Sequence, residues 1–154
     1  MSIEENLKKL DIRLPEGPKP VGAYVAYKKV GNLVFISGQI SLKSDGNLIK
    51  GKVGADLTLE EGQAAAKVCA VNILSQIKSA CNGDLDKVIN CVKITGFVNS
   101  TDDFVDQPKV INPASELLTA VFSEAGKHAR AAVSVSSLPL GAAVEIDAIF
   151  QVKE

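Results

Sequence analysis

Apolar and polar residues alternate near the end of the chain, and this alternation is the clearest strand pattern in the sequence. The apolar positions are Val144, Ile146, Ala148, Phe150 and Val152, with Glu145, Asp147 and Gln151 between them. A period of two is typical of a β-strand with one buried face, so we predict a strand over residues 143–152. A second strand is predicted over 131–136, joined to the first by a Leu-Pro-Leu-Gly corner.

Three further strands are predicted upstream. Residues 23–29 and 33–40 flank the turn sequence Val30-Gly31-Asn32 and are predicted to form a hairpin. The second of these strands begins with four consecutive apolar residues, which indicates a strand covered on both faces. Residues 88–99 form the third, with Val92, Ile94 and Val98 on one face.

Two helices are predicted between these strands. The first begins at Thr58, where Glu61 completes a capping box, and it ends at Asn82-Gly83. Its apolar residues recur every three or four positions, which gives the helix one apolar face. The second begins at Asn112-Pro113, because asparagine caps helices and proline suits the first helical position, and it ends at Gly126.

The order of these elements predicts a single α+β domain over residues 1–154. Residues 1–19 lead into it, first as a short amphipathic helix and then as a proline-containing extension. The remainder follows the order β-β-α-β-α-β-β, so we expect both helices on one face of a single mixed sheet. The opposite face carries polar and apolar positions, and oligomerisation could cover it.

Composition narrows the class of protein. Hydrophobic residues make up 46% of the chain, enough for a sizeable core although tryptophan is absent. The net charge of −1 and the lack of a basic block argue against nucleic acid as the main partner. No apolar run approaches the ~20 residues of a membrane helix, and the charged N-terminus has no signal-peptide core. We therefore expect a cytoplasmic protein without a membrane partner, whose cysteines, Cys69, Cys81 and Cys91, are reduced and buried.

The common catalytic motifs are missing from this sequence. It has no phosphate-binding loop, dinucleotide fingerprint or cluster of metal ligands, so we predict neither a metal site nor a cofactor. His128 is the only histidine, and a Ser-His-Asp triad would have to include it, yet no nucleophile elbow accompanies it. The alternative for His128 is a polar residue in the loop after the second helix.

Arginine is scarce, since Arg13 and Arg130 are the only two among seventeen cationic residues. Arg130 precedes the predicted strand 131–136, and Glu145 lies inside the strand that follows it. If these two strands pair antiparallel, the two side chains can lie close together. They then form either a plain structural ion pair or a carboxylate-binding guanidinium beside an acid that positions water.

Taken singly, Tyr24, Ser37 and Asn112 are explained as a core residue, a strand end and a helix cap. Taken together, the motifs resemble the YjgF/Rid family of reactive-intermediate deaminases. The matching pieces are Val-Gly-Ala-Tyr at 21–24, Val-Phe-Ile-Ser-Gly-Gln-Ile at 34–40, Asn112, Ala-Arg-Ala-Ala-Val-Ser-Val at 129–135, Leu-Pro at 138–139 and Val-Glu-Ile at 144–146. The combination is specific although no single piece is, and it covers the chain from about residue 20 to the C-terminus.

This resemblance implies a chorismate-mutase-like fold that assembles as a homotrimer around a central barrel, with a ligand cleft between each pair of subunits. In the family's deaminases, the arginine at the Arg130 position binds the substrate carboxylate, and the acid at the Glu145 position orients the attacking water. Positions that match Tyr24, Ser37, Gly38 and Asn112 line the cleft.

The implied reaction is the hydrolysis of a 2-imino acid, or its enamine tautomer, to a 2-keto acid and ammonia, without a cofactor. Such intermediates leak from pyridoxal-phosphate enzymes, so the role would be the control of metabolite damage. An imine is already electrophilic, so a clamped carboxylate and a placed water are sufficient chemistry. The alternative is a non-catalytic trimer that binds small 2-keto acids for sensing or regulation. RNA cleavage, proposed for relatives, has little support in this charge balance.

Several positions depart from the family pattern and favour a side branch of the family. His128-Ala129-Arg130 stands where many members have Pro-Ala-Arg, and Ala132 replaces a cysteine or serine. Ala23 replaces the proline of a Gly-Pro-Tyr sequence, and the loop over 42–57 is also altered. Because Arg130 is kept, carboxylate binding is predicted more firmly than catalysis.

Overall fold

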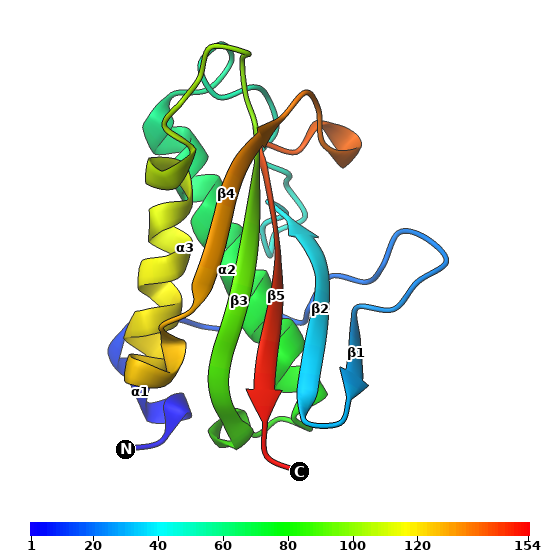
Figure 1. Cartoon of the computed structure of the whole chain (residues 1–154), viewed down its shortest axis with the longest axis vertical. Helices are drawn as coiled ribbons and strands as arrows, with labels where there is room; N and C mark the ends of the chain where they lie inside the picture. The colour runs from blue at the N-terminus through cyan, green and yellow to red at the C-terminus, as the bar shows by residue number, and fades with distance from the viewer.

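Five strands form one mixed sheet in the order β1-β2-β5-β3-β4 in the computed structural model, which describes residues 1–154 (Figure 1). The strands are β1 (Tyr27–Val30), β2 (Leu33–Ile40), β3 (Val88–Asn99), β4 (Ala129–Val135) and β5 (Val144–Val152). All neighbouring strands are antiparallel except β3 and β4, which are parallel. The predicted α+β class and the predicted order of these strands and the two main helices are confirmed.

Both main helices, α2 (Leu59–Ala80) and α3 (Gln107–Phe122), cover the same face of this sheet (Figure 1). The short α1 (Ile3–Lys9) precedes them and packs on α3, where the Asn6 side chain donates a hydrogen bond to the Val121 carbonyl at 2.8 Å. The core lies between the helices and the sheet, and its largest fully buried side chain is that of Phe150. Three 3₁₀ turns complete the chain, at Leu85–Lys87, Ser123–Gly126 and Pro139–Gly141.

The strongest sequence signals predicted element bounds correctly. Strands β2 and β3 have the predicted bounds, and α2 begins after Thr58 with both arms of the capping box formed with Glu61. The helix ends where Asn82 and Gly83 adopt φ angles of 54° and 89°, a conformation that asparagine and glycine tolerate better than other residues. The three cysteines are free and buried, as predicted.

The start of α3 differs from its prediction. The helix begins at Gln107, with Pro108 in its first turn, so Asn112 is not the cap and Pro113 lies inside the helix. A proline in a helix interior leaves the carbonyl four residues earlier without its N–H partner. Here the Lys109 carbonyl instead accepts a hydrogen bond from Gln63 Nε2 of α2 at 2.8 Å. A contact between two helices therefore compensates for the proline.

The last two strands do not pair with each other, which decides a question that the sequence left open. β4 pairs with β3 through a parallel ladder, and β5 pairs with β2 and β3, so β4 and β5 are not neighbours. The chain between β3 and β4 passes through α3, as a parallel connection requires. Strand β1 is also shorter than predicted, because residues 21–26 form bends and irregular chain before Tyr27.

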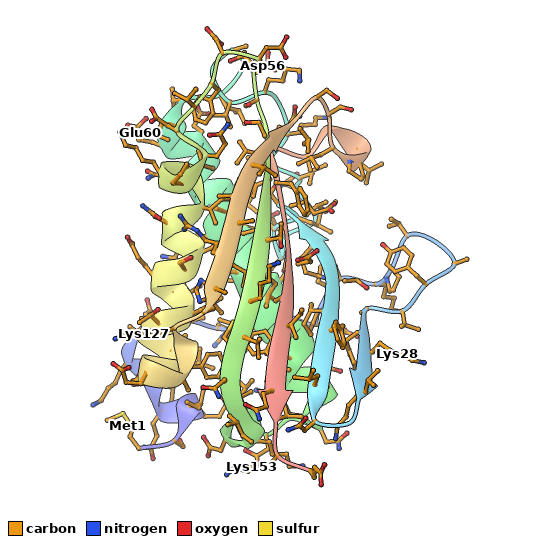
Figure 2. All side chains as sticks on the ribbon, viewed as in Figure 1. Met1, Lys28, Asp56, Glu60, Lys127 and Lys153 are labelled. Carbon is orange, nitrogen blue, oxygen red and sulfur yellow. The ribbon has the colours of Figure 1, made fainter.

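The face of the sheet opposite the helices has no second layer over it (Figure 2). Along β5, buried residues alternate with half-buried ones, which places Glu145 and Asp147 on this open face. Phe35 and Val133 are 41% and 44% exposed. No helix has the length and apolar character needed to cross a membrane.

Candidate functional site

One small cavity gathers four of the six predicted site residues. Tyr24, Ser37, Gly38 and Glu145 line a hollow of about 100 Å³, which has room for only a few non-hydrogen atoms. Its walls also include residues that were not predicted as site residues, namely Pro18, Pro20, Val21, Pro139 and Leu140. The lead-in, β2 and the corner before β5 therefore meet at one place on the surface. Tyr24 is 51% exposed, so it is not a core residue.

An irregularity in β2 shapes this cavity. The pairing register between β2 and β5 shifts between Ile36 and Gln39, so Ser37 is part of a bulge and not a strand end. The Ser37 hydroxyl donates a hydrogen bond of 2.6 Å to the Val25 carbonyl, which holds the lead-in beside the bulge. A Cβ atom at Gly38 would lie 2.6 Å from Glu145 Oε2, so only glycine leaves room for this carboxyl group.

The surroundings of Glu145 in this cavity favour the neutral form of its carboxyl group more than bulk water does. Burial raises the pKa of Glu145, and repulsion from Asp147 raises it further. Burial likewise raises the pKa of Asp147. None of the four ion pairs of the chain involves either group. A carboxyl group of raised pKa accepts a proton more readily than an ordinary one, which suits a general base that works near neutral pH.

Arg130 and Asn112 form a separate cluster, between β4 and α3. Arg130 Nη1 donates hydrogen bonds to Asn112 Oδ1 at 2.9 Å and to Ser115 Oγ at 3.2 Å. The two acceptors are three residues apart on α3, a spacing that places them on one face of the helix. Arg130 forms no ion pair, so its alternative role as the structural partner of Glu145 is wrong for this chain.

The two clusters lie on different sides of the sheet. Arg130 points toward α3 on the helix-covered side, whereas Glu145 belongs to the open face. Strand β3 separates them, since Arg130 is paired with Ile94 and Glu145 with Phe97. The antiparallel pairing that would have brought the two side chains together in one chain does not exist.

His128 belongs to the arginine cluster, which the sequence did not indicate. Its Nε2 lies 2.8 Å from Ser115 Oγ, and its Nδ1 lies 2.7 Å from the Gly126 carbonyl oxygen. The third member of a catalytic triad would be a carboxylate, but a backbone carbonyl occupies that place. Ser115 could have been found from its spacing to Asn112. His128 could not, because its partner is thirteen residues away in sequence.

Comparison with known proteins relates the whole chain to one family. A family model described as "YjgF/chorismate mutase-like, putative endoribonuclease" matches residues 4–150. Protein TCP17 of Trypanosoma cruzi is 45% identical over 150 residues, which is 97% of this chain and 93% of that protein. The crystal structure of protein Atu1372 from Agrobacterium tumefaciens superimposes with a TM-score of 0.91 at 46% identity, covering 98% of this chain and 92% of the other.

Two further relatives have names that describe a chemistry or a ligand. A 2-iminobutanoate/2-iminopropanoate deaminase of Dermatophagoides farinae is 29% identical over 139 residues, or 90% of this chain and 92% of that protein. The structure of Escherichia coli TdcF with bound serine has 25% identity and a TM-score of 0.62, covering 90% of this chain and 94% of the other. The backbone is thus more similar to the Agrobacterium protein than to TdcF.

Proposed function

This chain belongs to the YjgF/Rid family, and on that premise we propose that it hydrolyses small 2-imino acids to 2-keto acids and ammonia. Arg130 binds the substrate carboxylate in this proposal, and Glu145 orients and deprotonates the attacking water. Tyr24, Ser37, Gly38 and Asn112 complete the walls of the site. The relative from Dermatophagoides farinae, a deaminase of this substrate class, supports the proposal.

The single observation that carries this proposal is the state of Arg130. Its hydrogen bonds within the chain use Nη1 alone, and both acceptors are neutral oxygens. The full positive charge and the remaining N–H groups are therefore available to a ligand. A guanidinium in this condition suits a carboxylate, which it can bind through two parallel hydrogen bonds.

We further propose that the site forms between copies of this chain in a trimer. Arg130 and Asn112 of one copy face the cavity that contains Glu145, Tyr24 and Ser37 of its neighbour. The separation of the two clusters within one chain supports this arrangement, because neither cluster alone holds both Arg130, the proposed carboxylate receptor, and Glu145, the proposed base. The open, partly apolar face of the sheet also favours burial against another copy.

The proposed chemistry balances without any further reagent. In the protonated imine, the C=N carbon is electrophilic, and a water molecule held by Glu145 attacks it while its proton passes to the carboxylate. The nitrogen of the resulting carbinolamine takes this proton back from Glu145, and its C–N bond then breaks as the hydroxyl group gives its proton to the carboxylate and the C=O bond forms. One imino acid and one water give one 2-keto acid and one ammonia. The raised pKa of Glu145 supports its role as the base, because the proton transfer from water becomes less unfavourable.

The second candidate function is binding without catalysis. The serine bound to TdcF carries a carboxylate group. By analogy, it supports a site in this chain that recognises small carboxylates without converting them. The endoribonuclease in the family description is not carried over, because the chain has a net charge of −1.

Ammonia release from an imino acid generated in situ tests the proposal. The wild type should exceed the spontaneous rate, and Arg130→Ala and Glu145→Ala should each remove most of the excess. Arg13→Ala is the matched control, because Arg13 is the other arginine, is exposed and does not line the cavity. A wild type that binds 2-oxobutanoate but leaves the spontaneous rate unchanged would favour the second candidate. If Arg130→Ala altered neither rate nor binding, both candidates would be wrong.

A further inference from the structure

We propose that His128 is a positioning residue, which fixes Arg130 for the ligand carboxylate through the hydroxyl group of Ser115. This inference rests on the proposed role of Arg130. It concerns two residues outside the cavity, Ser115 and His128. The inference is carried by a chain of hydrogen bonds that runs from Gly126 through His128 and Ser115 to Arg130.

The direction of every hydrogen bond in this chain follows from its two ends. The Gly126 carbonyl can only accept, so His128 Nδ1 carries a proton and donates at 2.7 Å. In the neutral ring, Nε2 is then an acceptor, and the Ser115 hydroxyl must donate to it at 2.8 Å. The lone pairs of Ser115 Oγ are left for Arg130 Nη1, which can only donate, at 3.2 Å.

Gly126, where this series of hydrogen bonds begins, is held firmly in place. Gly126 is buried, and a Cβ atom at this position would overlap the Leu118 carbonyl oxygen of α3, so the turn packs directly on the helix. Its carbonyl therefore orients the imidazole, and the imidazole orients the hydroxyl. Without His128, the Ser115 hydroxyl would be free to rotate and to bond the carbonyl four residues earlier in α3, as helical serines often do. The lone pairs of Ser115 Oγ would then no longer be held toward Arg130 Nη1, which would keep only Asn112 as a fixed acceptor.

The hydrogen-bond partners of Arg130 are uncharged, and this has a consequence for its affinity for a ligand. An acidic partner would hold Arg130 as firmly, but it would neutralise the charge and compete with a ligand for the guanidinium. Asn112 and Ser115 hold it through dipoles only, and the imidazole adds no negative charge. Arg130 is thus preorganised at little cost to its attraction for an anion.

A purely structural role for His128 makes a different prediction. In that case, the ring only ties the start of β4 to α3, and its removal lowers stability without changing the recognition of a carboxylate. The test must therefore separate recognition of charge from folding. Binding of 2-oxobutanoate and of its uncharged amide, 2-oxobutanamide, provides this separation, because only the acid can engage the guanidinium through an anion.

Ser115→Ala and His128→Ala should each weaken binding of 2-oxobutanoate about tenfold, the size expected for a misplaced hydrogen bond to a charged group. Binding of 2-oxobutanamide should change far less. The double variant should bind about as weakly as Ser115→Ala alone, since both residues act through one hydroxyl. Ser115→Thr keeps the hydroxyl and should restore most of the affinity. Ser75→Ala removes a hydroxyl that bonds only within α2, so it should leave binding unchanged.

A nitrogen-detected spectrum of the imidazole gives a second readout, because His128 is the only histidine. At pH 9, the Nδ1–H tautomer of the neutral ring should dominate. Dominance of the Nε2–H tautomer would reverse the hydrogen bonds and overturn the inference. The inference would also be overturned if the variants bound 2-oxobutanoate as tightly as the wild type does. It would equally be overturned if their affinities for the acid and for the amide fell together with their thermal stability. If the wild type did not bind 2-oxobutanoate, the proposed function would fail and this inference with it, even with the tautomer as expected.

Discussion

Arg130 and Glu145 project from opposite sides of the sheet, with strand β3 between the strands that carry them. Arg130 bonds to α3 on the covered side, and Glu145 lines a cavity on the open side. A ligand of a few atoms cannot contact both groups of one chain. The proposed function therefore depends on assembly, and its tests must examine two copies as well as one.

Gly38→Ala should displace Glu145 without unfolding the protein. The new Cβ would lie 2.6 Å from Oε2 and 2.9 Å from Cδ of Glu145, and a side-chain carboxyl can move aside. We expect deaminase activity to fall at least about tenfold, because the base is no longer held at the site, while the melting temperature changes by only a few degrees. Turnover and thermal unfolding measure the two effects.

The double variant Gly38→Ala/Glu145→Ala is the control for this prediction. If alanine at position 38 acts through the carboxyl group, the double variant should be no less active than Glu145→Ala alone. A further loss of activity in the double variant would mean that Gly38 has another role, such as direct contact with the ligand.

Glu145→Gln should stabilise the protein at pH 8 and lower its activity. The pKa of Glu145 is raised in the folded state, first by burial and then by Asp147, so folding favours the protonated form. The folded state then holds more protons than the unfolded state between the two pKa values, and the free energy of unfolding falls as pH rises through that window. Glutamine removes this loss, so the two proteins should differ at pH 8 and converge near pH 4.

Urea unfolding at a series of pH values measures this difference. Glu16→Gln, which removes an exposed carboxylate of the lead-in, is the control and should show no comparable gain at pH 8. A Glu145→Gln variant that is less stable than the wild type at pH 8 would mean that the charged carboxylate is stabilised by a partner in solution.

Gln63→Ala should destabilise the protein only while Pro113 is present. Gln63 supplies the hydrogen bond that Pro113 denies to the Lys109 carbonyl, at a partly exposed position, so its loss should cost about 0.5–1 kcal/mol. In a Pro113→Ala background, the helix can make its own bond, and the same substitution should cost almost nothing. A double-mutant cycle from chemical denaturation measures this coupling. Equal costs in both backgrounds would contradict the role given to Gln63.

The sequence predicted elements well where local chemistry decides them. The capping box at Thr58 and the alternation in β5 each depend on residues that are close together in the sequence, and both are found where expected. The start of α3 was missed for a tertiary reason. Asn112-Pro113 has the chemistry of a helix start, but Gln63 on another helix satisfies the carbonyl that Pro113 leaves free.

Strand partners were harder to predict than strands. The alternation in β5 identifies its buried face but not its neighbours, and the antiparallel pairing with β4 that the sequence left open does not form. The candidate site also combines parts that the sequence pointed to with parts that depend on strand pairing. Ser37 and Gly38 line one cavity with Glu145, a placement that only the family resemblance implied, whereas the partners of Arg130 come from α3 and the turn before β4. That arrangement depends on which strands pair.

Mixing two inactive variants tests the shared site most directly. Arg130→Ala keeps Glu145, and Glu145→Gln keeps Arg130, so each alone should have little activity. If each cleft takes Arg130 from one chain and Glu145 from the next, random assembly of equal amounts leaves both groups intact in about a quarter of the clefts. We predict that co-refolded mixtures recover about a quarter of the wild-type rate, whereas separately refolded proteins mixed without exchange recover none. A co-refolded mixture that forms mixed trimers but stays inactive would contradict it.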